Sequence, residues 1–313
     1  MNAAPVRVLL GPQNPVRNIA TGLNDTGIPA GDIAVISAGW QEAENDIDDI
    51  RAVAGRSLVD LELYRRTEDV FAQDEALLAQ YRDRQNRLKE LQRLYRTRLR
   101  PLSLAARQML RYDGDPQIAA AERRHAIAQL RALDRHHLNG SESLNQAFHA
   151  EFDPFTHDSL TAHVREIRDI LSACSGVLIT GGNVAIIINR LRLFGLAELL
   201  SGIPVVAWSA GAMALAERIV LFHDRLPQGR RDPEILGAGL GLVPGYIVMP
   251  DPGNRLRFEY RTRQKLRARR FAPDICATLD NESLLVIADG RRVRADSVRR
   301  LNREGRHDWL HAS

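Results

Sequence analysis

Short apolar runs alternate with helical patterns over the first 66 or so residues of the chain. Side chains alternate between two faces along a strand, whereas apolar residues recur every three to four positions on a helix. On this basis we predict strands at 6–10, 33–37 and 58–64 and helices at 15–23 and 41–53. Strands that alternate with helices indicate βαβ units and therefore a parallel sheet.

The pattern changes between residues 68 and 150, where turn signals are few. A long helix is predicted over 68–110, with an apolar stripe formed by Leu77, Tyr81, Leu88, Leu91, Tyr95 and Leu99. A turn at 113–116 precedes a second helix over 118–137. We interpret the pair as an inserted helical hairpin, and its apolar stripe favours a homodimer through the insertion.

Strands and helices alternate again over residues 160–305. Helices are predicted at 160–173, 183–200, 210–221 and 255–270, and strands at 176–180, 203–207, 246–249, 277–279 and 283–288, with a hairpin turn at 289–290. The expected fold class is α/β, with a mostly parallel sheet and helices on both faces. The predicted division is 1–67 and 151–313 for the α/β domain and 68–150 for the hairpin insertion.

Composition sets the broad class. With 313 residues, of which 44% are hydrophobic, the chain can bury a large core and fold without disulfides or a structural metal. Cys174 and Cys276 lie in separate aliphatic contexts and lack metal-ligand spacing, which favours a reducing cytoplasm. No apolar stretch approaches the roughly 18 residues of a membrane span, and the first residues predict a strand, not a signal peptide. The net charge of +4 permits acidic ligands without requiring nucleic acid.

One serine stands where a buried strand ends and a helix begins. The segment 205–213, VVAWSAGAM, places Ser209 at this corner, and Gly211 with the flanking alanines lets the turn close tightly. A side chain at such a corner is exposed above the sheet beside free N–H groups, as a nucleophile requires. The alternative is an ordinary serine that caps the helix.

Four sequence blocks carry a resemblance to a known family. They are LITGGN at 178–183, AWSAGA at 207–212, GLGLVPG at 239–245 and LDNES…VIADG at 279–290. Their order and spacing resemble the aspartyl dipeptidase (peptidase E) and cyanophycinase family of serine hydrolases. The resemblance covers 160–295 well, 5–66 weakly and the hairpin not at all. It implies a flavodoxin-like sheet of the class I glutamine amidotransferase type and cleavage of amide bonds beside aspartate.

The resemblance assigns roles to matching residues. Ser209 matches the nucleophile, and the N–H groups of Ala210 and of Gly181 or Gly182 match the oxyanion hole. The two glycines could equally form a plain strand-to-helix turn. Asn183 would either orient the turn and touch substrate or cap the following helix.

The general base is the difficulty, because the position where the family has histidine holds Asp251. Three explanations remain open. His223, followed by Asp224 close to where the dipeptidases carry an acidic residue, could take the proton from Ser209. Asp251 itself could be the functional group. It could act as a base whose pKa is raised by burial, or it could bind a cationic ligand, which would make the pocket a sensor and not a hydrolase. A histidine near the return of the insertion could also serve: His149, His157 or His163.

The arginine-rich run at 255–270 offers substrate contacts. Arg255 or Arg257 could hold a substrate carboxylate, while the other arginines are expected on a solvated helical face. Together with the basic hairpin, that face could bind nucleic acid or an acidic protein, although no nucleic-acid motif is present. Asp280 and Glu282 would support the site or cap a turn.

The sequence therefore predicts a serine-dependent hydrolase, a peptidase or amidase acting on a small peptide or amide. The alternative is a catalytically inactive relative with a ligand-binding or scaffolding role. The chain has no dinucleotide fingerprint, no Walker loop and no histidine pair with zinc spacing, so neither a cofactor nor a metal is expected.

Overall fold

A nine-stranded sheet forms the centre of the protein in the computed structural model, which describes residues 5–224 and 232–312. The strand order is β11-β10-β9-β1-β5-β4-β2-β3, and β8 pairs with β9 beside β1. Five of these strands are parallel: β1 (Arg7–Leu10), β2 (Ile33–Ile36), β3 (Leu58–Asp60), β4 (Gly176–Ile179) and β5 (Val205–Trp208). The predicted α/β fold with a mostly parallel sheet is thus confirmed.

Helices cover both faces of the sheet. Val8 and Leu10 of β1 pack toward the helices α1 (Ile19–Asn24) and α2 (Asp48–Ala54), whereas Leu9 belongs to the core on the other face. That alternation is the two-residue period of a strand buried on both sides. The second face carries α6 (Asp158–Ala173), α7 (Val184–Leu193), α8 (Leu196–Ser201) and α9 (Ala210–Leu215). In the described residues, none of the helices is long and apolar enough to cross a membrane.

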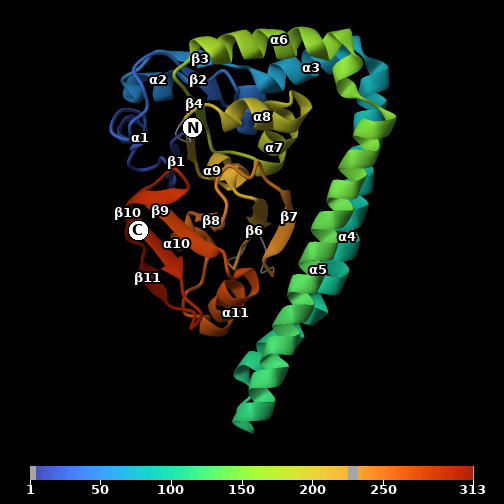
Figure 1. Cartoon of the computed structure of the whole chain (residues 1–313), viewed down its shortest axis with the longest axis vertical. Helices are drawn as coiled ribbons and strands as arrows, with labels where there is room; N and C mark the ends of the chain where they lie inside the picture. Colours follow the sequence, from blue (N-terminus) through green and yellow to red (C-terminus); the bar gives the residue numbers. More distant parts are fainter. Residues whose placement is uncertain (1–4, 225–231, 313) are drawn as a thin grey trace.

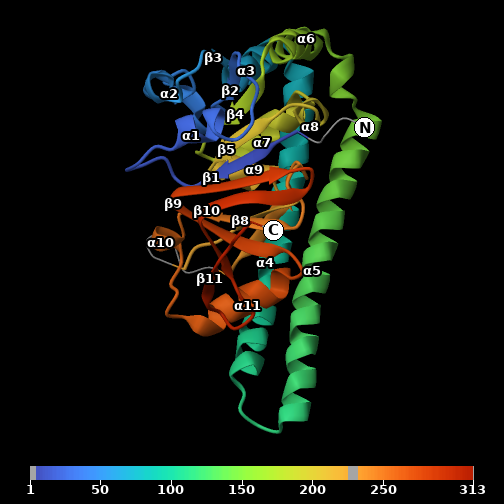
Figure 2. The same cartoon turned by 60° about the vertical axis from the view of Figure 1, so that its left-hand side comes forward.

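The insertion is a hairpin of two long helices, α4 (Glu75–Arg111) and α5 (Pro116–Glu151), preceded by α3 (Leu63–Gln73). Asp74 interrupts the predicted first helix, and its side chain accepts the N–H of Leu77 at 2.8 Å. Asp115 caps α5 in the same way. The second helix is longer than predicted, because residues 138–151 continue it. Both views of the molecule show the hairpin lying along the α/β body with its tip beyond it (Figures 1 and 2).

The inner side of the hairpin packs on its own chain. Leu77, Tyr81, Tyr95 and Leu99 of the predicted stripe are buried. Arg270 donates to both carboxylate oxygens of Asp134 on α5, at 2.7 and 2.6 Å, and Tyr95 donates to Asp134 at 2.9 Å. Since the stripe is already covered, it gives no reason for a second subunit, and the homodimer stays a prediction.

The chain after Ser209 departs from the predicted elements. The helix expected over 210–221 ends at Leu215, and residues Arg218–Leu221 form β6, which pairs with β7 (Glu234–Ala238). The arginine-rich segment forms two helices in place of one. The remaining elements are β8 (Tyr246–Pro250), α10 (Pro252–Arg255), α11 (Arg261–Phe271), β9 (Ile275–Ala288), β10 (Arg291–Leu301) and β11 (His307–Trp309); the 3-10 turns are η1 (Ala38–Ala43) and η2 (Pro154–Thr156).

The strands β1 and β8 pair with the same edge of β9, and their carboxyl ends point toward each other. We call the place where they meet the seam. β8 runs parallel to the first half of β9, with Pro250 opposite Leu279. β1 runs antiparallel to its second half, with Leu10 opposite Leu284. The carboxyl ends of both strands therefore meet beside residues 279–284 of β9, at the sheet edge where α/β proteins place their sites.

Candidate active site

Ser209 occupies a strained turn directly after β5. Its backbone angles are φ 48° and ψ −113°, a conformation that costs a non-glycine residue about 1–3 kcal/mol. The residue is partly buried, and its side chain makes no cap hydrogen bond to α9. The capping alternative is therefore wrong, and the hydroxyl is not committed to the helix that it precedes.

The turn closes because Gly211 has no side chain. A Cβ atom at this position would lie 2.5 Å from the carbonyl oxygen of Thr180 and 2.6 Å from that of Ile179. The first turn of α9 is thereby pressed against the end of β4. This contact fixes the height of Ser209 above the sheet.

The Gly181-Gly182 turn lies against Ser209. A Cβ atom on Gly181 would lie 3.3 Å from the Cβ of Ser209, and Gly182 has φ +117° and packs on the carbonyl of Gly39. Neither glycine N–H donates to another group in the described residues, and the N–H of Ala210 is the first of α9, with no acceptor inside the helix. The predicted oxyanion donors are thus close to Ser209, and their role in catalysis stays a prediction.

Asn183 caps the helix that follows the turn. Its side-chain oxygen accepts the N–H groups of Ala185 at 3.0 Å and Ile186 at 3.3 Å. The capping role that the sequence left open is therefore present. Contact of this exposed residue with substrate stays a prediction.

Asp251 stands on the other side of the seam. It follows β8 with φ 56°, and its N–H bonds to the carbonyl of Leu279 at 3.0 Å. Its carboxylate accepts the side-chain amide of Asn254 at 2.9 Å and lies 3.9 Å from Arg255. Gly11, which follows β1, packs on the backbone of Asp280, the residue directly after Leu279, so Asp251 and Ser209 border the same edge of the sheet.

His223 and Asp224 come to this edge from β6. The N–H of Asp224 bonds to the carbonyl of Arg255 at 2.8 Å, which anchors the pair beside α10. The rings of Phe222 and His223 are stacked with centroids 6.2 Å apart. His223 and Asp251 therefore both flank α10, although they are 28 positions apart in the sequence.

The carboxylate of Asp224 is fully buried among cationic and amide groups. It accepts from Arg263 at 2.9–3.0 Å, from Arg267 at 3.2 Å and from Gln264 at 3.1 Å. Burial alone would raise the pKa of Asp224, but the charges of Arg267 and Arg263 outweigh it and hold the pKa below its usual value. These contacts indicate an anchor for α11.

Three of the arginines of α11 are buried, so the expectation of a solvated face is wrong for them, whereas Arg261 is exposed as expected. Arg263, Arg267 and Arg270 are buried, because α11 lies between the hairpin and β9 and its cations pair with Asp224 and Asp134. These three side chains therefore cannot contribute to a basic surface that binds nucleic acid or an acidic protein.

Arg255 and Arg257 differ in their surroundings. Arg255 lies over the Phe222 ring, 5.7 Å from its centroid, and burial lowers its pKa. Arg257 is 3.9 Å from Glu259 and 3.3 Å from the Tyr260 hydroxyl. Of the two, Arg255 is the one beside Asp251.

The histidines near the insertion have other contacts. His157 lies 2.5 Å from the Asp74 carboxylate, His163 contacts Arg66 at 3.0 Å, and His149 packs on the Phe148 ring. These partners belong to the hairpin and its neighbour α3. In the part of the chain that the structure describes, these three histidines have their contacts away from Ser209, so the explanation based on them gains no support.

Asp280 and Glu282 lie on the β9 side of the seam. Burial raises the pKa of Asp280, while the charge of Arg299 and the N–H of Gly253 oppose that rise. Glu282 adopts φ 68° where the pairing of β9 with β10 shifts register. In the described chain, no cluster of three or more His, Cys, Asp or Glu could hold a metal ion.

Sequence reasoning missed the contribution of Gly39. Its carbonyl accepts the N–H of Asn183 at 2.9 Å and supports Gly182, so it helps to shape the turn beside Ser209. A helix was predicted from residue 41, whereas a 3-10 turn begins at Ala38. The small residues that follow the strand at 33–36 were the available signal.

Comparisons with known proteins were made for the whole chain. A model of peptidase family S51 matches residues 138–294, half of the chain, including Gly181, Ser209 and Asp251. A peptidase from an acI-B1 Actinobacterium has a similar solved structure, with 15% identity, 99% of this chain and 95% of that chain covered, and a TM-score of 0.47. A putative peptidase E from Listeria monocytogenes EGD-e has 12% identity, 96% and 100% coverage, and a TM-score of 0.42. No curated protein matches significantly.

Proposed function

The chain belongs to peptidase family S51, a family of peptidase-type hydrolases, and from this premise we propose that it hydrolyses a small peptide or amide through Ser209. The observation that carries the proposal is the backbone of Ser209. A strained serine whose side chain does not cap its helix has no evident structural use, and such strain is typically retained where it presents a reacting group.

The proposed reaction begins with attack of the Ser209 oxygen on the carbonyl carbon of the substrate. Negative charge then develops on the carbonyl oxygen, which the N–H groups of Ala210 and of Gly181 or Gly182 would stabilise. Loss of one such donor typically costs about 3–4 kcal/mol of transition-state stabilisation. Collapse of the tetrahedral intermediate releases the amine, and water then hydrolyses the acyl-enzyme.

We assign the proton acceptor to His223. Asp224 is already bonded to two arginines, and a carboxylate such as that of Asp251 is a weaker base toward a serine hydroxyl than an imidazole. His223 lies on the same edge of the sheet as Asp251, held there by the bond between Asp224 and Arg255. Arg255 would bind a carboxylate of the substrate, which favours cleavage beside an acidic residue.

A second candidate function is ligand binding without turnover. It is favoured by Asp251, which occupies the place where the family resemblance expects the catalytic histidine. In that case Ser209 and Asp251 would both contact a bound ligand, and no acyl-enzyme would form.

Labelling with a fluorophosphonate probe tests both candidates. The hydrolase proposal expects labelling that disappears in Ser209→Ala and persists in Ser172→Ala, a control at an exposed serine on α6. His223→Ala should slow labelling by about 100-fold or more, since a positioned base contributes that much. Absence of labelling in the folded wild-type protein would favour the binding function. Labelling that is lost in Asp251→Ala but kept in His223→Ala would assign the role of proton acceptor to Asp251.

A further inference from the structure

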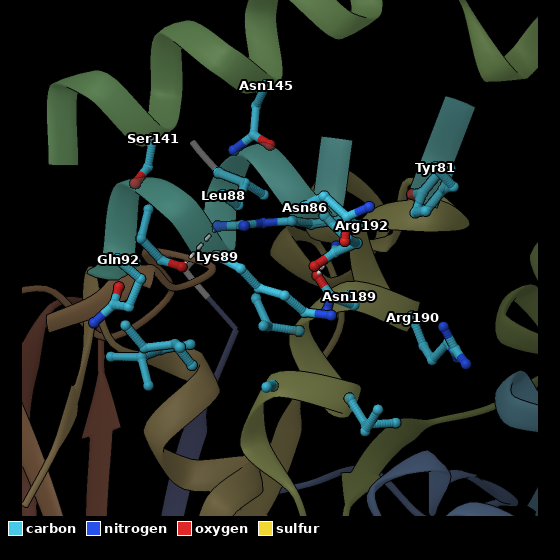
Figure 3. A pocket seen from close by; sticks show the side chains of 18 of the residues that line it. Tyr81, Asn86, Leu88, Lys89, Gln92, Ser141, Asn145, Asn189, Arg190 and Arg192 are labelled. Carbon is cyan, nitrogen blue, oxygen red and sulfur yellow. Dashed lines mark hydrogen bonds between the residues drawn. The ribbon is translucent and has the colours of Figure 1, made fainter. Parts of the chain in front are cut away.

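A large cavity lies away from Ser209, between the hairpin and the α/β body. Its volume is about 750 Å³, within the range of small-molecule sites. The walls come from α4 and α5 on one side and from α7, β6 and β7 on the other (Figure 3). The insertion thus creates this cavity, because neither half of the α/β domain supplies the outer wall.

Most of the wall is apolar. Side chains on every contributing element take part, including Phe71, Leu88, Leu138, Ile186, Ile219 and Leu236. A lining of this kind stabilises an aliphatic or aromatic body by about 25 cal/mol for each Å² removed from water.

The polar part of the wall is strongly biased toward positive charge. Five of its side chains are cationic, whereas Glu142 is its one carboxylate: the cations are Arg82, Lys89, Arg96, Arg190 and Arg192. Arg96 is paired with Glu234 at 2.6 Å, and Arg190 lies 3.5 Å from Glu68.

Arg192 and Lys89 lack such partners in the part of the chain that the structure describes. Arg192 reaches from α7 to the carbonyl of Ala238 on β7, at 2.6 Å, and forms no ion pair. Burial, helped by the charge of Arg84, lowers the pKa of Arg192. Lys89 extends from α4 into the same cavity, on the side of Asn189 (Figure 3). Glu142 of the same wall acts on Arg192 only at a distance, since the two form no ion pair, and an anion placed directly on the partly buried guanidinium would stabilise it.

A further group in the same wall is unsatisfied. The side-chain oxygen of Asn145 is buried with no hydrogen-bond partner in the described residues. Buried polar atoms are almost always bonded, so this acceptor indicates a water molecule or another hydrogen-bond donor that the cavity receives beside the bound molecule.

We propose that this cavity binds an amphipathic anion, a molecule with an aliphatic chain and one carboxylate or phosphate group. The chain lies on the apolar wall formed by α5, α7 and β7, and the anionic group lies between Lys89 and Arg192. This site is independent of the proposed hydrolysis, since Ser209 is not part of its wall.

The experiment measures binding to the full-length protein by calorimetry, below the micelle concentration of each probe. The probes share a twelve-carbon chain and differ in their head group: dodecanoate, dodecyl phosphate and dodecyltrimethylammonium. Binding of both anions with at least tenfold preference over the cation is expected. The tighter of the two anions identifies the head group, and equal or tighter binding of the cation would refute the proposal.

Two kinds of variant locate the bound molecule. Lys89→Gln combined with Arg192→Gln should weaken dodecanoate binding at least tenfold, whereas Arg98→Gln, an exposed position on α4 outside the cavity, should not. Gly237→Leu provides a test that leaves every charge in place. A Cβ at Gly237 meets no atom within 4 Å, so the new side chain starts in open space at the cavity wall. Unchanged affinity of a folded Gly237→Leu protein would show that the anion binds elsewhere.

Discussion

Removal of the Asp224 carboxylate separates a structural role for this residue from a catalytic one. In Asp224→Ala the guanidinium groups of Arg263 and Arg267, whose side chains are 7% and 0% exposed, would lose their shared carboxylate. Breaking a buried ion pair from one side typically costs about 3–5 kcal/mol, because the remaining charge is left buried. We therefore expect the free energy of unfolding to fall by that amount.

Urea unfolding followed by circular dichroism measures this loss. The matched control is Glu90→Ala, which removes an exposed ion pair with Arg93 and should cost less than about 1 kcal/mol. Asp224→Asn keeps one acceptor oxygen and should lie between the two. A stability within 1 kcal/mol of the wild type, combined with lost fluorophosphonate labelling, would refute the structural role and make Asp224 a member of the catalytic machinery.

The pH dependence of the same variants provides an independent check. The pKa of Asp224 is lowered in the folded protein, so its contribution to stability is complete above the unfolded pKa near 3.9. That contribution is lost as the pH falls through the folded pKa. The difference in stability between wild type and Asp224→Asn should accordingly shrink toward strongly acidic pH, and a difference that stays constant would contradict the sign of the shift.

Three further predictions concern the turn at Ser209, the region before the hairpin and the hairpin itself. Gly211→Ala should abolish fluorophosphonate labelling and cost about 1–3 kcal/mol in urea unfolding, because its Cβ would lie 2.5 Å from the Thr180 carbonyl oxygen. Burial raises the pKa of Glu44 to about 7, so its stabilising contribution is complete below about 4.3 and is lost as the pH rises toward 7; Glu44→Gln should flatten this dependence in thermal melts at graded pH. Asp134→Ala should leave the buried Arg270 uncompensated and release the hairpin, measured as faster proteolysis within 75–151, whereas intact hairpin protection would exclude this account of docking.

The sequence was most informative where one physical signal had no competitor. Strand 205–208 is a run of buried residues followed by small ones, which few local structures other than a tight corner accommodate. The angles of Ser209 confirm that corner, and the family model confirms the resemblance built on it. The hairpin was also predictable, because apolar spacing over some 70 residues exceeds what a loop would show.

The errors came from interactions between distant segments. Residues 218–221 have apolar side chains at positions compatible with a helix, and only their pairing with β7 makes them a strand. Charge alone placed the arginines of α11 in solvent, since no sequence pattern reveals that Asp134 and Asp224 are buried opposite them. The homodimer was inferred from a stripe that the chain itself covers, so this argument for it fails, and the homodimer stays a prediction.

The seam explains how the site can keep its shape although the expected histidine is replaced. The turn at Ser209 depends on Gly211 and on the ends of β4 and β5, whereas Asp251 is fixed by β8 and by its bond to Leu279. Since these two sets of contacts share no side chain, a substitution at position 251 leaves the strain at Ser209 unchanged. A turn that continues to hold about 1–3 kcal/mol of strain without a use would be expected to relax under further substitution. The strain at Ser209 therefore supports the proposal that the site still acts on its ligand although position 251 holds an aspartate.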